Sequence, residues 1–227
     1  MHQDEYAALQ DDIKSLPSQH VYLNSTPVVT VNNTELNTWD CLTAAVWGNM
    51  NILLFGEKGE GKTQIENDIR NCFFGGKATY VRMHDDFTLS DLYASFNLEK
   101  LSGDAGTVQD AQELLGSVNN ALTIVDELNR AHLKVQNRLF SIFDKYIVFK
   151  AEKTPLGIER EDRTRYHIAV GSANIDALRY GGTSVIDDAM LDRSHVILNI
   201  NNYFPNAVDT ATARLRSAGR GIEDFDN

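Results

Sequence analysis

One stretch of eight residues has the residue types and the spacing that hold a phosphate group. It is Gly56-Glu57-Lys58-Gly59-Glu60-Gly61-Lys62-Thr63, which matches the pattern G-x-x-x-x-G-K-[ST] at every fixed position. Glycines let the backbone turn tightly enough to point several N–H groups at one phosphate, and a helix that starts there adds its partial positive charge. The stretch therefore predicts a phosphate-binding loop; the alternative is a flexible turn rich in glycine and lysine.

Two side chains at the end of this loop are expected to act on a nucleotide and its metal ion. Lys62 would reach the β- and γ-phosphates, and the hydroxyl of Thr63 would bind Mg²⁺. The helix that follows would pack on a sheet through an apolar stripe made of Ile65, Ile69, Cys72 and Phe73.

Two carboxylates follow an apolar run roughly 60 residues after the loop. Asp126 and Glu127 come directly after residues 121–125, and ligands bind at this end of the strands in open α/β sheets. Asp126 could hold Mg²⁺ through its water shell. Glu127 points elsewhere and could orient or deprotonate the water that attacks the γ-phosphate. The alternative is an acidic cap on a buried strand.

The elements around these residues alternate between strand and helix. Strands are expected at residues 52–55, 79–83, 122–125, 166–172 and 195–200, separated by helical segments. This order predicts an α/β fold with a five-stranded, doubly wound parallel sheet.

Shorter elements are predicted around this sheet. Helices are expected at residues 4–14 and from near Thr34 to Gly48, and a polar helical stretch at 207–217. Residues 21–32 should be extended, residues 98–108 should form a surface loop, and a hairpin should precede the fourth strand near residues 146–158.

Composition limits the class of protein. The chain has 227 residues and a formal net charge of −11, which disfavours broad coating of nucleic acid. No apolar run approaches the roughly 18 to 20 residues of a membrane span, and the N-terminus does not resemble a signal peptide. Cys41 and Cys72 are expected to be reduced core residues. We therefore expect a soluble, cytoplasmic protein without a membrane partner.

The segment that begins at the acidic pair also carries a family resemblance. Asp126-Glu127-Leu128-Asn129-Arg130-Ala131 resembles the D-E-[IL]-N-R-A signature of AAA+ ATPases of the MoxR-like and dynein-related group, which includes the cobaltochelatase small subunit and gas-vesicle ATPases. The resemblance covers about residues 34–206. It implies a P-loop NTPase sheet of AAA+ type with helices on both faces, and it implies ATP and Mg²⁺ as cofactors.

The resemblance also implies two further catalytic residues. Asn174, after the fourth strand, would bind the attacking water or the γ-phosphate. Arg193, in an L-D-R stretch, would reach the γ-phosphate of a neighbouring subunit. From the residues alone, Asn174 could instead cap a turn, and Arg193 could pair with Asp187 or Asp192.

The boundaries follow from the same comparison. Residues 1–33 are expected to form an N-terminal helix and extended segment, residues 34–202 the nucleotide-binding core, and residues 203–227 a helical tail. The helical lid that such modules carry is expected to be missing or truncated.

Three functions are compatible with these predictions. The first is ATP hydrolysis in a homo-oligomeric ring, expected to be a hexamer, that remodels a protein client or acts with a partner carrying a metal-dependent adhesion domain. The second is a nucleotide-gated binding module with negligible turnover. The third is a DNA-remodelling relative that uses Lys145, Lys150 and Lys153, although the acidic balance makes nucleic acid the least favoured partner.

Overall fold

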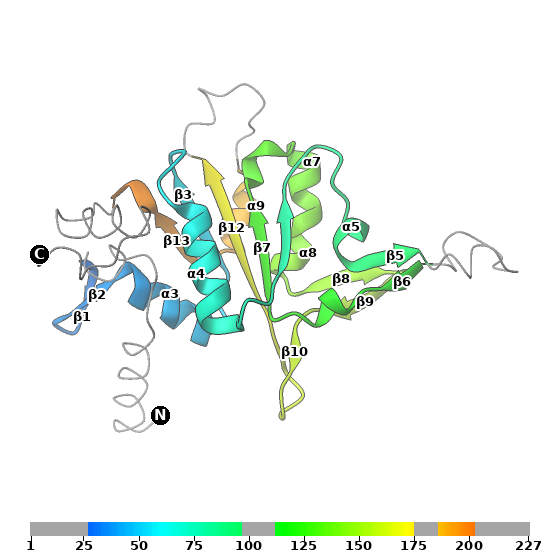
Figure 1. The fold of residues 1–227 in the computed structure, drawn as a ribbon, viewed down its shortest axis with the longest axis horizontal. Coiled ribbons are helices and arrows are strands. Elements are labelled where there is room, and N and C mark those ends of the chain that lie inside the picture. The colour runs from blue at the N-terminus through cyan, green and yellow to red at the C-terminus, as the bar shows by residue number, and fades with distance from the viewer. Residues whose placement is uncertain (1–26, 97–111, 175–185, 203–227) are drawn as a thin grey trace, which may run out of the picture.

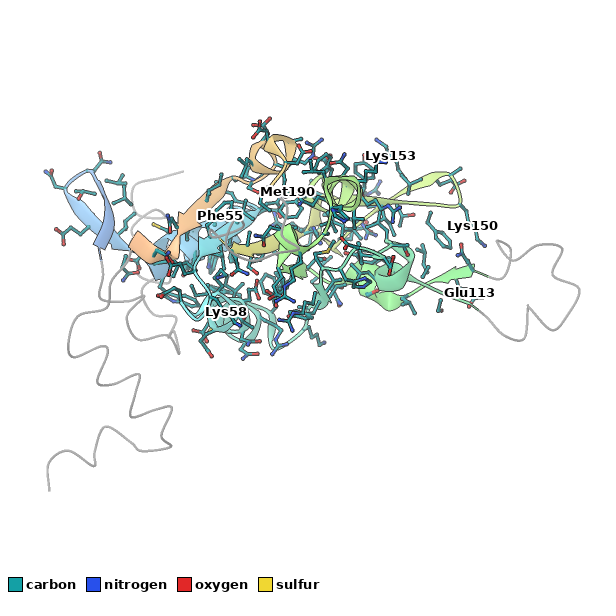
Figure 2. The ribbon with its side chains drawn as sticks, turned by 90° about the horizontal axis from the view of Figure 1, so that it is seen from above. Phe55, Lys58, Glu113, Lys150, Lys153 and Met190 are labelled. Carbon is teal, nitrogen blue, oxygen red and sulfur yellow. The ribbon has the colours of Figure 1, made fainter. Side chains whose placement is uncertain are left out.

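The computed structural model describes residues 27–96, 112–174 and 186–202 (Figure 1). The helices predicted at residues 4–14 and 207–217 and the loop predicted at 98–108 lie outside these ranges. So do nearly all of the predicted N-terminal segment and the whole predicted tail.

A five-stranded parallel sheet forms the centre of the molecule, in the order β13-β3-β12-β7-β4. Its strands are β3 (Ile52–Gly56), β4 (Thr79–Arg82), β7 (Leu122–Asp126), β12 (Ile168–Asn174) and β13 (Val196–Asn199). Each predicted strand is present, with ends shifted by at most two residues. The predicted α/β fold with a doubly wound parallel sheet is confirmed.

Helices cover both faces of this sheet (Figure 1). Alternate residues along the central strands point to opposite faces, so Leu54 and Ile124 pack under α3 (Thr38–Trp47) and α4 (Lys62–Phe74). Leu53 and Val125 pack on the other face. That face is covered by α7 (Leu133–Gln136), α8 (Phe140–Phe143) and α9 (Asp188–Asp192). Both faces are apolar, which explains why the central strands have continuous apolar sequences.

The first helix of the core does not start where the sequence predicted. Residues 34–37 form strand β2 (Thr34–Asn37), antiparallel to β1 (Pro27–Val31), and the helix begins at Thr38. The side chain of Asn37 accepts a hydrogen bond from the backbone of Asp40, and the side chain of Asp40 accepts one from the backbone of Asn37. This reciprocal cap fixes the start of the helix and leaves Leu36, which was predicted to lie on the helix, in the strand.

Hairpins extend from the core (Figure 1). The predicted hairpin is confirmed as β8 (Tyr146–Phe149) and β9 (Glu152–Pro155). The sequence did not predict the others. The remaining elements are β5 (Ala94–Phe96), β6 (Gln112–Leu114), β10 (Ile158–Glu159), β11 (Arg165–Tyr166), α5 (Ser90–Tyr93) and the 3-10 helices η1 (Gly116–Asn119), η2 (Leu128–Arg130), η3 (Asn137–Leu139) and η4 (Ile200–Asn202).

A fully buried asparagine joins elements at the amino edge of the sheet. The amide of Asn51 donates to the carbonyl oxygens of Phe143 (2.7 Å) and Arg193 (3.0 Å), and its oxygen accepts from the backbone of Ala169 (3.0 Å). One side chain therefore connects the ends of α8 and α9 to the start of β12. None of the helices in the described ranges combines the length and the apolar character that a membrane crossing requires.

Candidate functional site

The predicted phosphate loop lies between the end of β3 and the start of α4. Gly59 and Gly61 have φ angles of +95° and +90°, which glycine adopts without the penalty that a Cβ would impose. Helix α4 begins without a side-chain cap. Since the first N–H groups of a helix have no partner within it, the loop and helix start form a concave set of donors suited to an anion.

Lys62 folds back on this loop. Its Nζ donates to the carbonyl oxygens of Gly56 and Glu57, each at 2.7 Å. Burial lowers the pKa of Lys62, while the charges of Asp126 and Glu66 oppose that shift. A phosphate that enters the loop would compete with two neutral carbonyls for this ammonium group.

An asparagine distant in sequence holds the start of the loop. The backbone N–H of Glu57 donates to Oδ1 of Asn201 in η4, at 2.8 Å. The sequence analysis did not identify Asn201, because nothing local marks a contact across 144 residues.

Asp126 ends β7 and is buried between two hydroxyl groups. Ser172 Oγ donates to one carboxylate oxygen and Tyr80 OH to the other, both at 2.8 Å. Burial, and then the bond to Asp126, raise the pKa of the Tyr80 phenol. Neutral donors from the strands on either side thus orient this carboxylate without neutralising its charge.

Glu127, the next residue, lies between two arginines. It has a left-handed φ of 57°, which turns its side chain away from that of Asp126. Arg82 at the end of β4 pairs with one of its oxygens, and Arg130 pairs with the other at 2.9 Å. The arginine side chains are 61% and 50% exposed, whereas that of Glu127 is 13% exposed. The sequence analysis assigned no role to Arg82.

Asn174 ends β12, beside the loop. The strand register pairs it with Gly56, where the loop begins. The buried amide of Asn129 donates to the backbone oxygen of Asn174 (2.9 Å) and accepts from its N–H (3.2 Å). The alternative role for Asn174, capping a turn, stays a prediction, because the residues that would follow it in such a turn lie outside the described ranges.

Glu66 is a second buried carboxyl group at this edge, one helical turn after Lys62. It is 1% exposed, and neither of its oxygens has a hydrogen-bond partner. Burial, followed by the negative charge of Asp126, raises the pKa of Glu66 to about 8, which Ser172 and Lys62 offset only in part. The sequence analysis did not identify Glu66, although a charged residue directly after Ile65 of the apolar stripe was a signal that could have found it.

The oxygen groups gathered here suit Mg²⁺. Mg²⁺ prefers oxygen ligands and relies on water and substrate phosphates for much of its coordination. Thr63 is exposed at the start of α4, and Asp126 and the unpartnered Glu66 offer carboxyl oxygens. Within the described ranges, no three His, Cys, Asp or Glu side chains could hold a metal by themselves.

Arg193 lies far from this group, at the amino edge of the sheet. It follows α9 and precedes the first residue of β13. Its Nε pairs with Asp144 at 3.1 Å, its Nη1 donates to the carbonyl of Ala189, and its guanidinium lies 4.6 Å from the ring centre of Phe140. The alternative pairing predicted with Asp187 or Asp192 is therefore wrong in its partner: Asp187 caps α9 instead.

Comparison with known proteins gives a family and a fold. The family model of the AAA domain, dynein-related subfamily, matches residues 51–194. The crystal structure of a putative ATPase from Cytophaga hutchinsonii has a TM-score of 0.58 and 17% sequence identity. That match covers 96% of this chain but only 56% of the other, and identity this low shows the fold alone. A search of curated proteins finds no match.

Proposed function

Since the chain belongs to the dynein-related subfamily of AAA domains, we propose that it binds ATP with Mg²⁺ at the carboxyl edge of its sheet and hydrolyses the γ-phosphate. One observation carries this proposal: the register of parallel strands gathers the phosphate loop, Asp126, Glu127 and Asn174 at a single edge. These groups come from β3, β7 and β12, and each matches a requirement of phosphoryl transfer to water.

Binding would begin at the loop from Gly56 to Thr63. The backbone N–H groups of the loop and of the first turn of α4 would hold the phosphates, with Glu57, Lys58, Gly59, Glu60 and Gly61 contributing backbone. Lys62 would exchange its two carbonyl partners for phosphate oxygens, because an ion pair with phosphate is stronger than a bond to a neutral acceptor.

Thr63 and Asp126 would hold the metal ion. An ion held by these two side chains would supply positive charge against the negative charge that develops on the phosphate. The hydroxyl groups of Ser172 and Tyr80 keep both oxygens of Asp126 oriented, so this carboxylate would not need to reorganise on binding.

Glu127 would orient the attacking water or accept its proton, and Asn174 would hold that water or the γ-phosphate. As described, Glu127 is engaged by Arg82 and Arg130. These arginines are largely exposed, so the pairs are weak and a bound nucleotide could displace them. Asn129 would position Asn174 by holding its backbone on both sides.

Arg193 would act on a neighbouring subunit. It lies at the opposite edge from the phosphate loop of its own chain, so it would contribute to hydrolysis only in trans, after release from Asp144. This supports a homo-oligomeric ring, with a hexamer as the expected size. By resemblance to the MoxR-like group, such a ring would remodel a protein client, alone or with a partner that has a metal-dependent adhesion domain.

A second candidate function is a nucleotide-gated binding module with negligible turnover. The double ion pair on Glu127 favours it, because each oxygen of this carboxylate is occupied by an arginine and neither is free to orient a water molecule. In that case ATP would assemble the ring without being consumed.

One experiment separates these functions. ATPase rate and particle mass are measured with and without ATP and Mg²⁺ for the wild type, Lys62→Ala, Glu127→Gln and Arg193→Ala. Hydrolysis is expected in the wild type and lost in all three variants, with ATP-dependent oligomers in the wild type. Assembly with ATP but without turnover would favour the binding module, and no ATP binding by the wild type would refute both.

A further inference from the structure

Glu66 is a buried carboxyl group that the proposed reaction does not use. It is 1% exposed in the interior between α4 and the sheet, and both of its oxygens lack a hydrogen-bond partner. A buried carboxylate without a donor destabilises the folded protein, so groups of this kind are rare in native structures and call for an explanation.

The neighbouring donors are already engaged. The Ser172 hydroxyl lies close to Glu66, but its single hydrogen is donated to Asp126 at 2.8 Å. Lys62 precedes Glu66 by one helical turn, yet its ammonium group points to the carbonyls of Gly56 and Glu57. Within the described part of the chain, the charge of Lys62 therefore offsets the burial of Glu66 only in part, and no group donates a hydrogen bond to its oxygens.

The neighbours of Glu66 place it beside the proposed metal site: Ser172, which lies close to Glu66, bonds to Asp126 at 2.8 Å. The acidic groups that act on it are Asp126 and Glu127, and it follows Thr63 by three residues on α4. Residues three apart on a helix lie on the same side of it. Two carboxyl groups near one buried point cannot both carry a charge without repulsion, and the repulsion is relieved when one is protonated or when a cation binds both.

We propose that Glu66 is a third protein oxygen group of the divalent-cation site, acting with Thr63 and Asp126 and accepting hydrogen bonds from water bound to the cation. The inference rests on the proposed Mg²⁺ site and extends it. With Glu66 as a second acidic group beside Asp126, the protein would hold a divalent cation without nucleotide, so the cation could bind before ATP.

The test is a titration of the complete 227-residue chain with Mn²⁺, without nucleotide, in which electron paramagnetic resonance measures free Mn²⁺. The wild type is expected to bind Mn²⁺, with Mg²⁺ competing. Glu66→Gln, which keeps the shape and removes the charge, should weaken binding about 10-fold or more, as loss of an outer-shell ligand does. Glu66→Asp should weaken it less, since the carboxylate remains.

Asp68→Asn is the matched control. Asp68 is also a fully buried carboxyl group on α4, but it accepts a hydrogen bond from Gln64 at 2.8 Å, and its charge acts on Cys72, further along the helix from the loop. This variant should bind Mn²⁺ as the wild type does.

A second readout does not depend on the titration. Mg²⁺ should raise the melting temperature of the wild type more than that of Glu66→Gln, because a ligand stabilises the state that binds it more tightly. A purely structural role would instead change the melting temperature equally with and without Mg²⁺.

Two results would overturn the inference. One is unchanged Mn²⁺ affinity in Glu66→Gln, and the other is a wild type that binds no Mn²⁺ without nucleotide. Failure of the proposed function would be distinguishable from failure of this inference, because the wild type would then bind no ATP even at saturating Mg²⁺.

Discussion

The two edges of the parallel sheet hold their polar groups in different ways. At the amino edge, Asn51 is buried and bonded to three backbone groups, and Nε2 of buried His167 bonds to Thr123 at 2.9 Å. At the carboxyl edge, Glu127 is paired with exposed arginines and Glu66 has no hydrogen-bond partner. The contrast fits the proposed function: at the amino edge, hydrogen bonds and the Arg193–Asp144 ion pair connect the elements, whereas the charged groups of the carboxyl edge lie where a ligand would bind.

Arg193 is a test of this difference between the two edges, because it lies at the amino edge but is proposed to act in catalysis. In the assembled protein, Arg193→Ala should lower kcat about 10³-fold with ATP affinity retained, since an arginine finger stabilises the transition state. Steady-state hydrolysis at saturating ATP measures this effect.

Asp144→Asn is the control for Arg193. It removes the ion pair but leaves the guanidinium, so kcat should stay within a few-fold of the wild type. Equal losses in both variants would show that Arg193 matters only as the partner of Asp144.

Replacing Asn51, the buried asparagine at the amino edge, should make the folded protein less stable and leave its affinity for ATP unchanged. Asn51→Ala is expected to lower the free energy of unfolding by about 3 kcal/mol, because three buried backbone groups lose their partner. Urea unfolding measures the change, with exposed Asn71→Ala as a control that should stay within about 0.5 kcal/mol. A large loss of ATP affinity in Asn51→Ala would contradict the separation of the two edges.

His167, at the same edge, should make the folded protein less stable at acid pH. Burial, and then the charge of Lys145, lower the pKa of His167 to about 3 from an ordinary value of 6.5. The unfolded chain takes up this proton below pH 6.5 and the folded chain does not, so this contribution to stability is lost as pH falls from 6.5 toward 3.

Between pH 7 and pH 5 the loss should be about 2 kcal/mol. His167→Gln should remove that part of the pH dependence in urea unfolding, and exposed His84→Gln should not. The same slope in His167→Gln as in the wild type would show that the ring is not held neutral.

The smallest effect is expected at the exposed side of the carboxyl edge. Arg82→Ala frees one oxygen of Glu127 and should raise kcat by a few-fold, because the pair it removes is exposed and weak. ATPase assays at saturating ATP measure the change, and Arg165→Ala, remote from the loop, is the control. A fall in kcat would mean that Arg82 assists the reaction directly.

The sheet and the phosphate loop were predictable because their signals are local. Continuous apolar runs marked the strands around Leu53 and Ile124, and eight adjacent residues marked the loop. The cap at Asn37 was missed because strand and helix patterns both fit residues 34–37. The partners of the site residues were also missed: Tyr80 and Ser172 reach Asp126 only through strand register, which no single segment of sequence encodes.

The ion-pair partner of Arg193 could not be predicted for the same reason, because the two residues are distant in the sequence. An arginine beside Asp192 in the sequence suggested a local ion pair, yet its partner is Asp144, 49 residues earlier. The turn after α8 brings Asp144 to the end of α9, and that proximity exists only once both helices pack on the same face of the sheet.

Whether the carboxyl edge hydrolyses ATP is decided by a single-turnover assay. Radiolabelled ATP is bound to excess wild type or Glu127→Gln with Mg²⁺, and the bound nucleotide is analysed over time. The wild type should convert bound ATP to ADP, and Glu127→Gln should bind ATP and convert it at least about 10²-fold more slowly. Equal rates in the two proteins, or unchanged ATP on the wild type, would contradict a hydrolytic site built around Glu127.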